Sequence, residues 1–302
     1  MKRAELFTFW REAVSIKGSV TPIVILNVFV FGFIAAFICV ADHYIEEAFK
    51  VNLGLEVGPH EIAGAALGLL LILRTNAGYD RWWEGRILWG GIVNQCRNLA
   101  LESMAYGPRD KVWHRELLTW VKVFPHAAKA TLRSEKESIN FEHLLGKDEA
   151  EKLVSSSHMA FYVLLKIAEL LREALENGEI NHFAFAQMER ERSQLMDHIG
   201  ACERILKTPL PFVYSVKIRR FVAIFLVTLP FALLHQMETD WLVPLVIMLV
   251  GYPLVSLDQI GIELQNPFYK SSLNHLPLDE IASSIEKTIH EMNASFEKSE
   301  VK

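Results

Sequence analysis

The stretch PIVILNVFVFGFIAAFICVA, from Pro22 to Ala41, decides the class of fold to which this chain belongs. Its twenty residues carry no charge, and only Asn27 is clearly polar. A helix of this length covers about 30 Å, the thickness of the hydrocarbon core of a bilayer. A cleaved signal peptide fits less well, because the run is too long, begins too late and lacks a small-x-small cleavage motif. The stretch therefore predicts a membrane-spanning helix.

The composition of the whole chain fits a membrane protein with a large water-exposed part. Hydrophobic residues make up 51% of the 302 residues and charged residues 22%, which excludes a disordered chain, a collagen-like repeat and a basic nucleic-acid-binding protein. The formal net charge of -5 is too small to identify a partner. The three cysteines, Cys39, Cys96 and Cys202, lie far apart and indicate neither a disulfide framework nor a zinc site. We predict no metal, no cofactor and no nucleic-acid partner.

Three shorter apolar runs follow the first one. The run from Ile62 to Leu73 has twelve residues, a length that by itself is more typical of a buried core helix than of a span. The runs from Phe221 to Leu234 and from Trp241 to Leu257 are separated by the six residues HQMETD, as in a helical hairpin that turns at a membrane surface. Extended back to Ile218, the first run of this hairpin reaches seventeen residues, near the lower limit for a span.

Charged residues at the ends of these runs favour four spans over a core helix. Bases are in excess before the first run, after the second and before the third, whereas acids are in excess from Asp42 to Glu61, and the HQMETD turn has no base. This alternation satisfies the positive-inside rule when every run crosses the membrane. The chain is therefore predicted to be a multi-pass protein of the cell membrane with both termini in the cytoplasm.

The remaining polar sequence is predicted to be helical as well. In HMAFYVLLKIAELLREALENG the apolar positions recur at three- and four-residue steps, as in a helix packed on one face; they are Val163, Ile167, Leu170, Leu171 and Ala174. The last twenty residues are polar and are expected to fray or to wrap the surface. The predicted fold class is an all-α integral membrane protein with four transmembrane helices and a cytosolic bundle of long helices.

The predicted segments follow one another without a linker. Residues 1–73 hold the first two membrane helices, at about 19–41 and 59–73, and residues 74–217 form the cytosolic helical region. Residues 218–262 hold the third and fourth membrane helices, and residues 263–302 form a cytosolic tail.

The densest cluster of unusual residues is RTNAGYDRWWEGRILWGGIVNQCRNLA, from Arg74 to Ala100. Aromatic side chains and arginines just beyond a span are typical of an anchor at the membrane interface. The same residue types also fit a ring of charges and aromatics around a pathway, and the residue types alone leave both interpretations open. The residues concerned are Tyr79, Trp82, Trp83, Trp89, Arg74, Asp80, Arg81, Glu84 and Arg86; the stretch also contains Asn76.

Four stretches in the same order resemble the bestrophin family of ion channels. The signature-like stretch is RTNxxYDRWWEGRxxWG, from Arg74 to Gly90. It is followed by CERILKTPLPFVY, which contains Pro209 and Pro211, and by IGIELQNPF, which ends in Asn266, Pro267 and Phe268. LPLDEI, from Leu276 to Ile281, completes the series. The resemblance covers nearly the whole chain and implies a homopentameric channel of the cell inner membrane, with four membrane segments per subunit around one pore.

The resemblance also implies where the pore is narrow. Gly64 and Gly68 in the second run allow neighbouring helices to approach closely. Three residues at four-residue steps that end just before Arg74 correspond to the family's hydrophobic neck; they are Ala65, Leu69 and Leu73. A leucine stripe that faces lipid or a core is the alternative. Ala65 is smaller than the residues that the family typically places there. A second, cytosolic aperture is carried over to Phe183, which is equally compatible with an ordinary core position.

Calcium gating of the kind found in animal members is not expected. Those members bind calcium through an acidic cluster directly after the NPF-like motif, whereas YKSSLNH follows Phe268 here. A calcium site needs about six oxygen ligands, several of them carboxylates. Asp279 and Glu280 come too late and are too few to supply it.

Selectivity remains open between anions and monovalent cations. The resemblance favours chloride, although bacterial-type members can favour sodium. Acidic residues predicted on the outer side would enrich cations near the mouth, although salt screens those that do not face the pore. These acids are Asp42, Glu46, Glu47, Glu56, Glu61, Glu238 and Asp240.

The sequence also bears on two classes of function other than a channel. An enzyme is not predicted, since the sequence has no HExxH, no paired CxxC and no glycine-rich phosphate loop. A non-conducting membrane scaffold or sensor with the same fold remains an alternative. The expected partners are therefore monovalent ions, chloride or sodium, membrane lipid and further copies of the chain.

Overall fold

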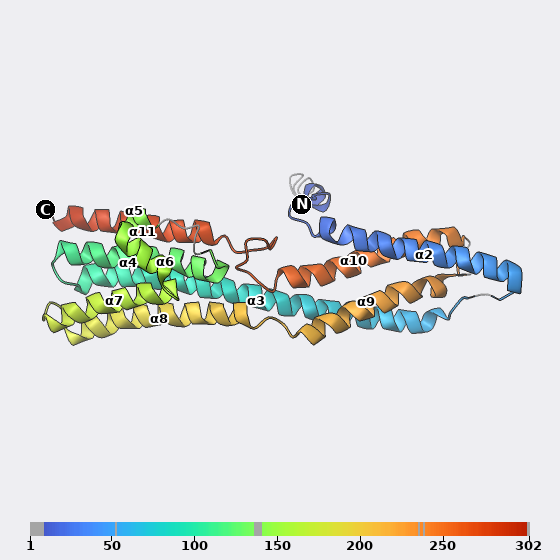
Figure 1. The fold of residues 1–302 in the computed structure, drawn as a ribbon, viewed down its shortest axis with the longest axis horizontal. Helices are drawn as coiled ribbons and strands as arrows, with labels where there is room; N and C mark the ends of the chain where they lie inside the picture. The colour runs from blue at the N-terminus through green and yellow to red at the C-terminus, as the bar shows by residue number, and fades with distance from the viewer. Residues whose placement is uncertain (1–8, 52, 136–140, 235, 238, 301–302) are drawn as a thin grey trace. The chain divides into compact units, whose positions relative to one another are not determined.

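The computed structural model describes residues 9–51, 53–135, 141–234, 236–237 and 239–300, and within these residues it contains helices but no strand. Figure 1 shows the helices in chain order. Residues 9–13 are helical, and the principal helices are α2 (Thr21–Phe49), α3 (Val57–Tyr106), α4 (Lys111–Arg133), α5 (Glu142–Leu145), α6 (Lys147–Ser155), α7 (Met159–Glu176), α8 (His182–Lys207), α9 (Phe212–Leu233), α10 (Val243–Glu263) and α11 (Leu278–Glu300). A short 3₁₀ helix, η1 (Asp240–Leu242), precedes α10.

The chain divides into two compact units. The first unit contains residues 1–82, 209–266 and 272–274, and the second contains residues 83–208, 267–271 and 275–302. Helix α3 is continuous across the boundary, so its residues up to Trp82 belong to the first unit and those from Trp83 to the second.

The first unit packs α2, α9, α10 and the N-terminal part of α3 around two apolar clusters. In one cluster Ala35 and Ile38 of α2 meet Val243 and Ile247 of α10. In the other, Leu67 and Leu71 of α3 meet side chains of α9. Helices α2 and α10 approach closely at Gly32, where a Cβ would lie 2.6 Å from Cγ of Met248.

Among the described residues, three helices are long and apolar enough to cross a membrane by length and composition; they are α2, α3 and the segment of η1 and α10. The apolar run from Pro22 to Ala41 lies within α2, which begins at Thr21, two residues after the predicted start of the span, continues to Phe49 and is followed by Lys50 in the left-handed conformation. Helix α3 does not stop at Leu73 but runs on for a further 33 residues to Tyr106. Every stretch of 18 residues in α9 includes the three cations Lys217, Arg219 and Arg220. Helix α9 is therefore too highly charged to be counted with these three.

The second unit is a bundle formed by α4, α7, α8, α11 and the later part of α3. Helix α4 packs against α7 and α11, and α7 packs against α8. The periodicity predicted in α7 is confirmed, because all five of its apolar positions are buried; they are Val163, Ile167, Leu170, Leu171 and Ala174.

The C-terminal segment forms a helix that packs on the bundle. Ala282, Ile285 and Ile289 of α11 are fully buried, and the helix contacts α4. Of the two expectations for this segment, packing on the surface is confirmed and fraying is wrong for the described part of α11. Apolar residues at three- and four-residue steps stabilise the helix against α4 by the burial of one face.

Candidate functional site: the exposed face of helix α3

Helix α3 has one face that packs inside the first unit. Leu67, Leu71, Arg74 and Gly78 follow one another at steps of four, three and four residues, and all four are buried. This spacing keeps them on one side of a helix. The chain therefore uses this side of α3 for its own packing and leaves the opposite side to other contacts.

The three residues of the predicted neck lie on the side that the chain itself leaves uncovered. Ala65, Leu69 and Leu73 are exposed, with Leu69 at 59% and Leu73 at 51%. Two further residues of the motif, Asn76 and Asp80, are also exposed and follow Leu73 at steps of three and four residues, so they continue the same side. Each chain thus presents a stripe that is apolar at first and polar one turn later.

An ion triad holds the buried side of α3 in place. Nη1 of Arg74 lies 2.6 Å from Oδ1 of Asp258 on α10, and Nε of Arg219 on α9 donates to Oδ2 of the same carboxylate at 3.0 Å. Arg74 also donates to the carbonyl oxygen and the hydroxyl of Ser215, at 3.5 and 3.4 Å. Arg74 is 1% exposed and Asp258 is 6% exposed. Burial strengthens such a pair, but it also makes either charge costly without the other.

Asp258 is a site residue that the sequence analysis missed. It is the only charged residue between Val243 and Ile262. An acid in an otherwise uncharged apolar run requires a cationic partner. The sequence therefore indicated that Asp258 has such a partner, but it did not show that the partner is Arg74.

The next part of the motif binds the segment that follows α10. Nε of Arg81 donates to the carbonyl oxygen of Gln265 at 3.1 Å, and Nε1 of Trp82 donates to that of Asn274 at 2.7 Å. The Tyr79 ring stacks on Trp82 with centroids 6.2 Å apart. Arg81 and Trp82 therefore hold the segment after α10 against α3 in the first unit, and the anchor interpretation stays a prediction.

In the second unit the motif packs against the NPF-like segment. A Cβ at Gly85 would lie 2.8 Å from Cγ of Pro267 and 3.3 Å from the Phe268 ring. Phe268 is fully buried and Pro267 is buried, so a glycine at position 85 allows this close approach. The other motif residues are less enclosed: Glu84 accepts a hydrogen bond from Arg204 at 2.6 Å, Trp83, Arg86, Pro209 and Pro211 are exposed, and Asn266 is half-buried.

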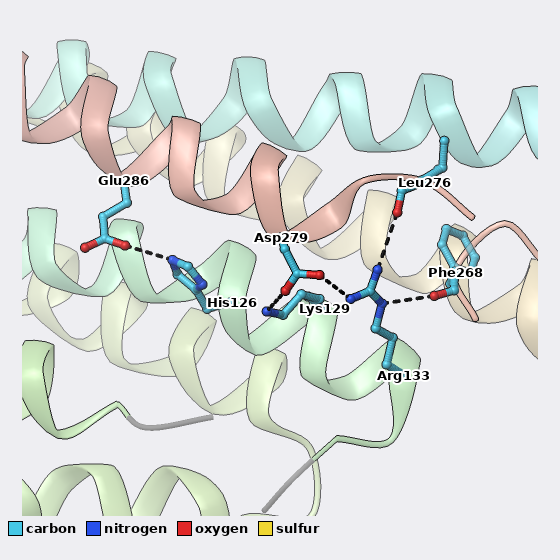
Figure 2. A network of polar contacts seen from close by, with 7 residues as sticks. All are labelled: His126, Lys129, Arg133, Phe268, Leu276, Asp279 and Glu286. Atoms are coloured by element: carbon cyan, nitrogen blue, oxygen red, sulfur yellow. Dashed lines mark hydrogen bonds and ion pairs between the residues drawn. The ribbon is translucent and has the colours of Figure 1, made fainter. Parts of the chain in front are cut away.

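A polar network fixes the NPF-like segment and α11 to α4, as Figure 2 shows. Nε of Arg133 donates to the carbonyl oxygen of Phe268 at 3.0 Å, and its Nη1 lies 2.6 Å from Asp279. Lys129 donates to the other oxygen of Asp279 at 2.6 Å. The Lys129 hydrogen bond, supported by Arg133 and opposed by burial, holds the pKa of Asp279 well below its usual range. His126, one turn before Lys129, pairs with Glu286 at 2.9 Å, and burial outweighs this pairing and lowers the pKa of the imidazole.

Phe183 is the second residue of α8 and is 88% exposed. Within one chain it is therefore not a core residue. The other interpretation, that Phe183 lines a cytosolic aperture of the channel, stays a prediction.

The segment after the NPF-like motif offers little for a divalent cation. Tyr269 and Lys270 are exposed, and the carboxylate of Asp279 is already shared by two cations. Among the described residues, no three histidine, cysteine or acidic side chains lie close enough together to hold a metal ion.

Comparisons with known proteins agree with this architecture over nearly its full length. Residues 1–291 match the bacterial and fungal bestrophin family. The chain is 33% identical to a voltage-dependent anion channel-forming protein of Nostoc sp., over 77% of this chain and 76% of that protein. It is 32% identical to the voltage-dependent anion channel-forming protein YneE of Escherichia coli, over 82% of this chain and 80% of YneE. The crystal structure of a bacterial bestrophin homologue from Klebsiella pneumoniae matches with a TM-score of 0.81 at 25% identity, over 90% of this chain and 98% of that one.

An all-helical membrane protein with apolar helices long enough to span a bilayer is thus the class that the fold defines. The chain belongs to the bestrophin family, in its bacterial and fungal branch. That family is one of ion channels and not of enzymes.

Proposed function

We propose that this protein is a channel that conducts monovalent anions, chloride above all, through one pore on the axis of a homopentamer. The observation that carries the proposal is the uncovered stripe of Ala65, Leu69 and Leu73 on α3. Two relatives more than 30% identical to this chain are named anion channel-forming proteins, which supports the choice of anions.

Five copies of the stripe could together line a pore, which a single chain cannot do. Around a five-fold axis, Leu69 and Leu73 form two rings of isobutyl groups, and a hydrophobic constriction of this kind gates by dewetting. Asn76 and Asp80 would then form polar rings immediately beyond the constriction. Closed cyclic assembly also gives each subunit the same contacts, so that one chain sequence suffices. Phe183 would narrow a second aperture.

The proposed topology has four spans, formed by α2, the first part of α3, α9 and α10, with both termini in the cytoplasm. The excess of bases at alternate ends supports this orientation. Helix α9 is the weakest span by composition because of its three cations. One of them, Arg219, is paired with Asp258, which lowers the cost of placing this part of α9 at the membrane.

The acidic residues predicted on the outer side are the observation that favours sodium as a second candidate. Glu46, Glu47, Glu56 and Glu61 are exposed. Asp42 does not belong with them, because it is 2% exposed and its carboxylate accepts a hydrogen bond from the backbone of Leu53 at 2.9 Å. Asp240 is partly buried, and Glu238 lies outside the described residues.

Purified protein in lipid vesicles tests the proposal. Under a sodium chloride gradient, a reversal potential close to the chloride equilibrium potential supports the anion channel, and one close to the sodium equilibrium potential replaces it with the cation channel. Vesicles that hold the protein but release ions no faster than protein-free vesicles contradict both candidates and favour a scaffold. Native mass measurement of the same sample gives the number of chains, and a monomer or dimer contradicts the pentameric pore.

A further inference from the structure

The ion triad of the first unit carries one positive charge in excess. Two arginines, Arg74 and Arg219, share the single carboxylate of Asp258. The next acid along α10, Glu263, is already engaged with Gln259, Ser272 and the backbone of Leu273. An uncompensated charge at the edge of a membrane core is costly. A bound anion would neutralise the excess positive charge of the triad.

A cavity of about 280 Å³ lies beside the triad, between α2, α9 and α10. Its polar lining comes from Asn27, Arg219, Asp258 and Gln259, and the rest of its wall is made of valine, alanine and phenylalanine side chains. This volume is just below the range of sites that enclose whole drug-sized ligands. It suits the polar part of an amphipathic molecule whose apolar part lies outside.

Two side chains at this cavity have donors to spare. Only Nε of Arg219 is used by Asp258, and its terminal amino groups contact no other acceptor in the part of the chain that the structure describes. Asn27, the one clearly polar residue of the run from Pro22 to Ala41, is exposed. Its side-chain amide likewise makes no hydrogen bond with a described residue. Arginine and amide donors together are well suited to phosphate oxygens.

The surroundings of Asn27 are apolar and open. Ile23 and Val30, at steps of four and three residues on the same side of α2, are each 47% exposed. Asn27 lies on the second turn of α2, which begins at Thr21, about 9 Å along the helix axis. A ligand with its phosphate at Asn27 and Arg219 could therefore lay a hydrocarbon chain along Val30.

We propose that this cavity binds the headgroup phosphate of an anionic phospholipid. The terminal amino groups of Arg219 and the amide of Asn27 donate to the phosphate oxygens, and an acyl chain follows the exposed side of α2. The negative charge of the lipid balances the excess charge of the triad. The site rests on the proposed topology, which brings the start of α2, the start of α9 and the end of α10 to the cytoplasmic leaflet.

The test is native mass spectrometry of the delipidated full chain in its native assembly, titrated with phosphatidylglycerol. The matched pair of variants is Arg219→Gln and Arg220→Gln, because Arg220 is the adjacent, exposed arginine on α9 and does not line the cavity. Loss of a charge-assisted donor pair is expected to weaken binding by about tenfold or more in Arg219→Gln, whereas Arg220→Gln binds as the unmodified protein does. Phosphatidylcholine, which has no net charge, is expected to bind more weakly than phosphatidylglycerol.

A second variant avoids any change to the triad. Ala223→Leu fills the cavity with apolar atoms and leaves all charges in place, so weaker lipid binding by this variant supports the site even where Arg219→Gln fails to assemble. Equal binding by the Arg219 and Arg220 variants, or by Ala223→Leu and the unmodified protein, overturns the proposal. Displacement of the lipid by inorganic phosphate at equal concentration also overturns it, since the site would then recognise a free anion.

Ion flux from the same samples separates this proposal from that of the channel. If the protein conducts chloride but all variants bind lipid equally, the result contradicts the lipid site and supports the channel. If the variants bind lipid as expected but the protein does not conduct ions, the result supports the lipid site and contradicts the channel.

Discussion

Arg74 and Asp258 form a buried salt bridge, with 2.6 Å between Nη1 and Oδ1, that joins α3 to α10. Leu73, the residue before Arg74, is half exposed and lies about 100° around the helix axis from it. Fixing the rotation of α3 about its axis at Arg74 therefore also fixes the direction in which Leu73 points.

The salt bridge is expected to be essential for stability. Asp258→Asn leaves Arg74 buried without its counter-ion, and breaking a buried pair in this way costs about 3–5 kcal/mol. Thermal unfolding of the purified protein in detergent measures the effect. Asp80→Asn is the matched control, since Asp80 lies on α3 but is exposed, and its cost should stay within about 0.5 kcal/mol. Equal melting temperatures for the two variants would mean that the triad contributes nothing.

The proposed neck predicts a gain in conductance. Replacing Leu69 and Leu73 by alanine widens both rings, so single-channel conductance should rise and selectivity among ions of one sign should weaken. Leu71→Ala serves as the control, because Leu71 is fully buried and its truncation should cost roughly 2–5 kcal/mol without raising the current. A double variant that is destabilised and conducts as before would place these leucines against lipid or a neighbouring subunit.

The network around Asp279 predicts a loss of stability in acid. Lys129 and Arg133 lower the pKa of Asp279 in the folded protein, whereas an aspartate in an unfolded chain titrates at about 3.9. The stabilisation is therefore complete above that pH and is lost as the pH falls toward the folded value. The effect is moderated by solvent, since the Asp279 side chain is 54% exposed.

Comparison of variants isolates this contribution from other carboxylates. Asp279→Asn should melt below the unmodified protein at neutral pH, and the difference should shrink below about pH 4. Glu280→Gln changes the adjacent exposed acid and should follow the unmodified protein throughout. A difference between Asp279→Asn and the unmodified protein that is constant from neutral pH to pH 3 would contradict the assignment to this ion pair.

The close approach of α3 and α10 predicts that Gly78 cannot be replaced. A Cβ at this position lies 2.8 Å from the carbonyl oxygen of Gly261, and backbone atoms cannot rotate away, so the helices must separate. Gly78→Ala should cost about 1–3 kcal/mol. At Gly200 in α8 no atom lies within 4 Å of an added Cβ, so Gly200→Ala should be neutral or stabilising by up to about 1 kcal/mol. Denaturation of both variants in the same detergent decides the comparison.

Sequence by itself determined the features that depend on neighbours along the chain. The uncharged run from Pro22 to Ala41 predicts a long apolar helix because hydropathy and helix length are local properties, and α2 contains it. The apolar positions of α7 are buried as their spacing predicts. The signature-like stretch that begins at Arg74 indicated the family, which the comparisons show.

Only the tertiary structure decided which distant groups meet. Arg74 could have been an interfacial anchor or a pore residue by its type alone, and the fold pairs it with Asp258 on another helix. The sequence raised Asp279 only as an insufficient calcium ligand, and the fold places it beside Lys129 and Arg133 of α4. The uninterrupted course of α3 past Leu73 also could not be derived from hydropathy, because a change from apolar to polar residues does not end a helix. Ion pairs and helix contacts depend on the path of the whole chain, and no local pattern of residues contains that path.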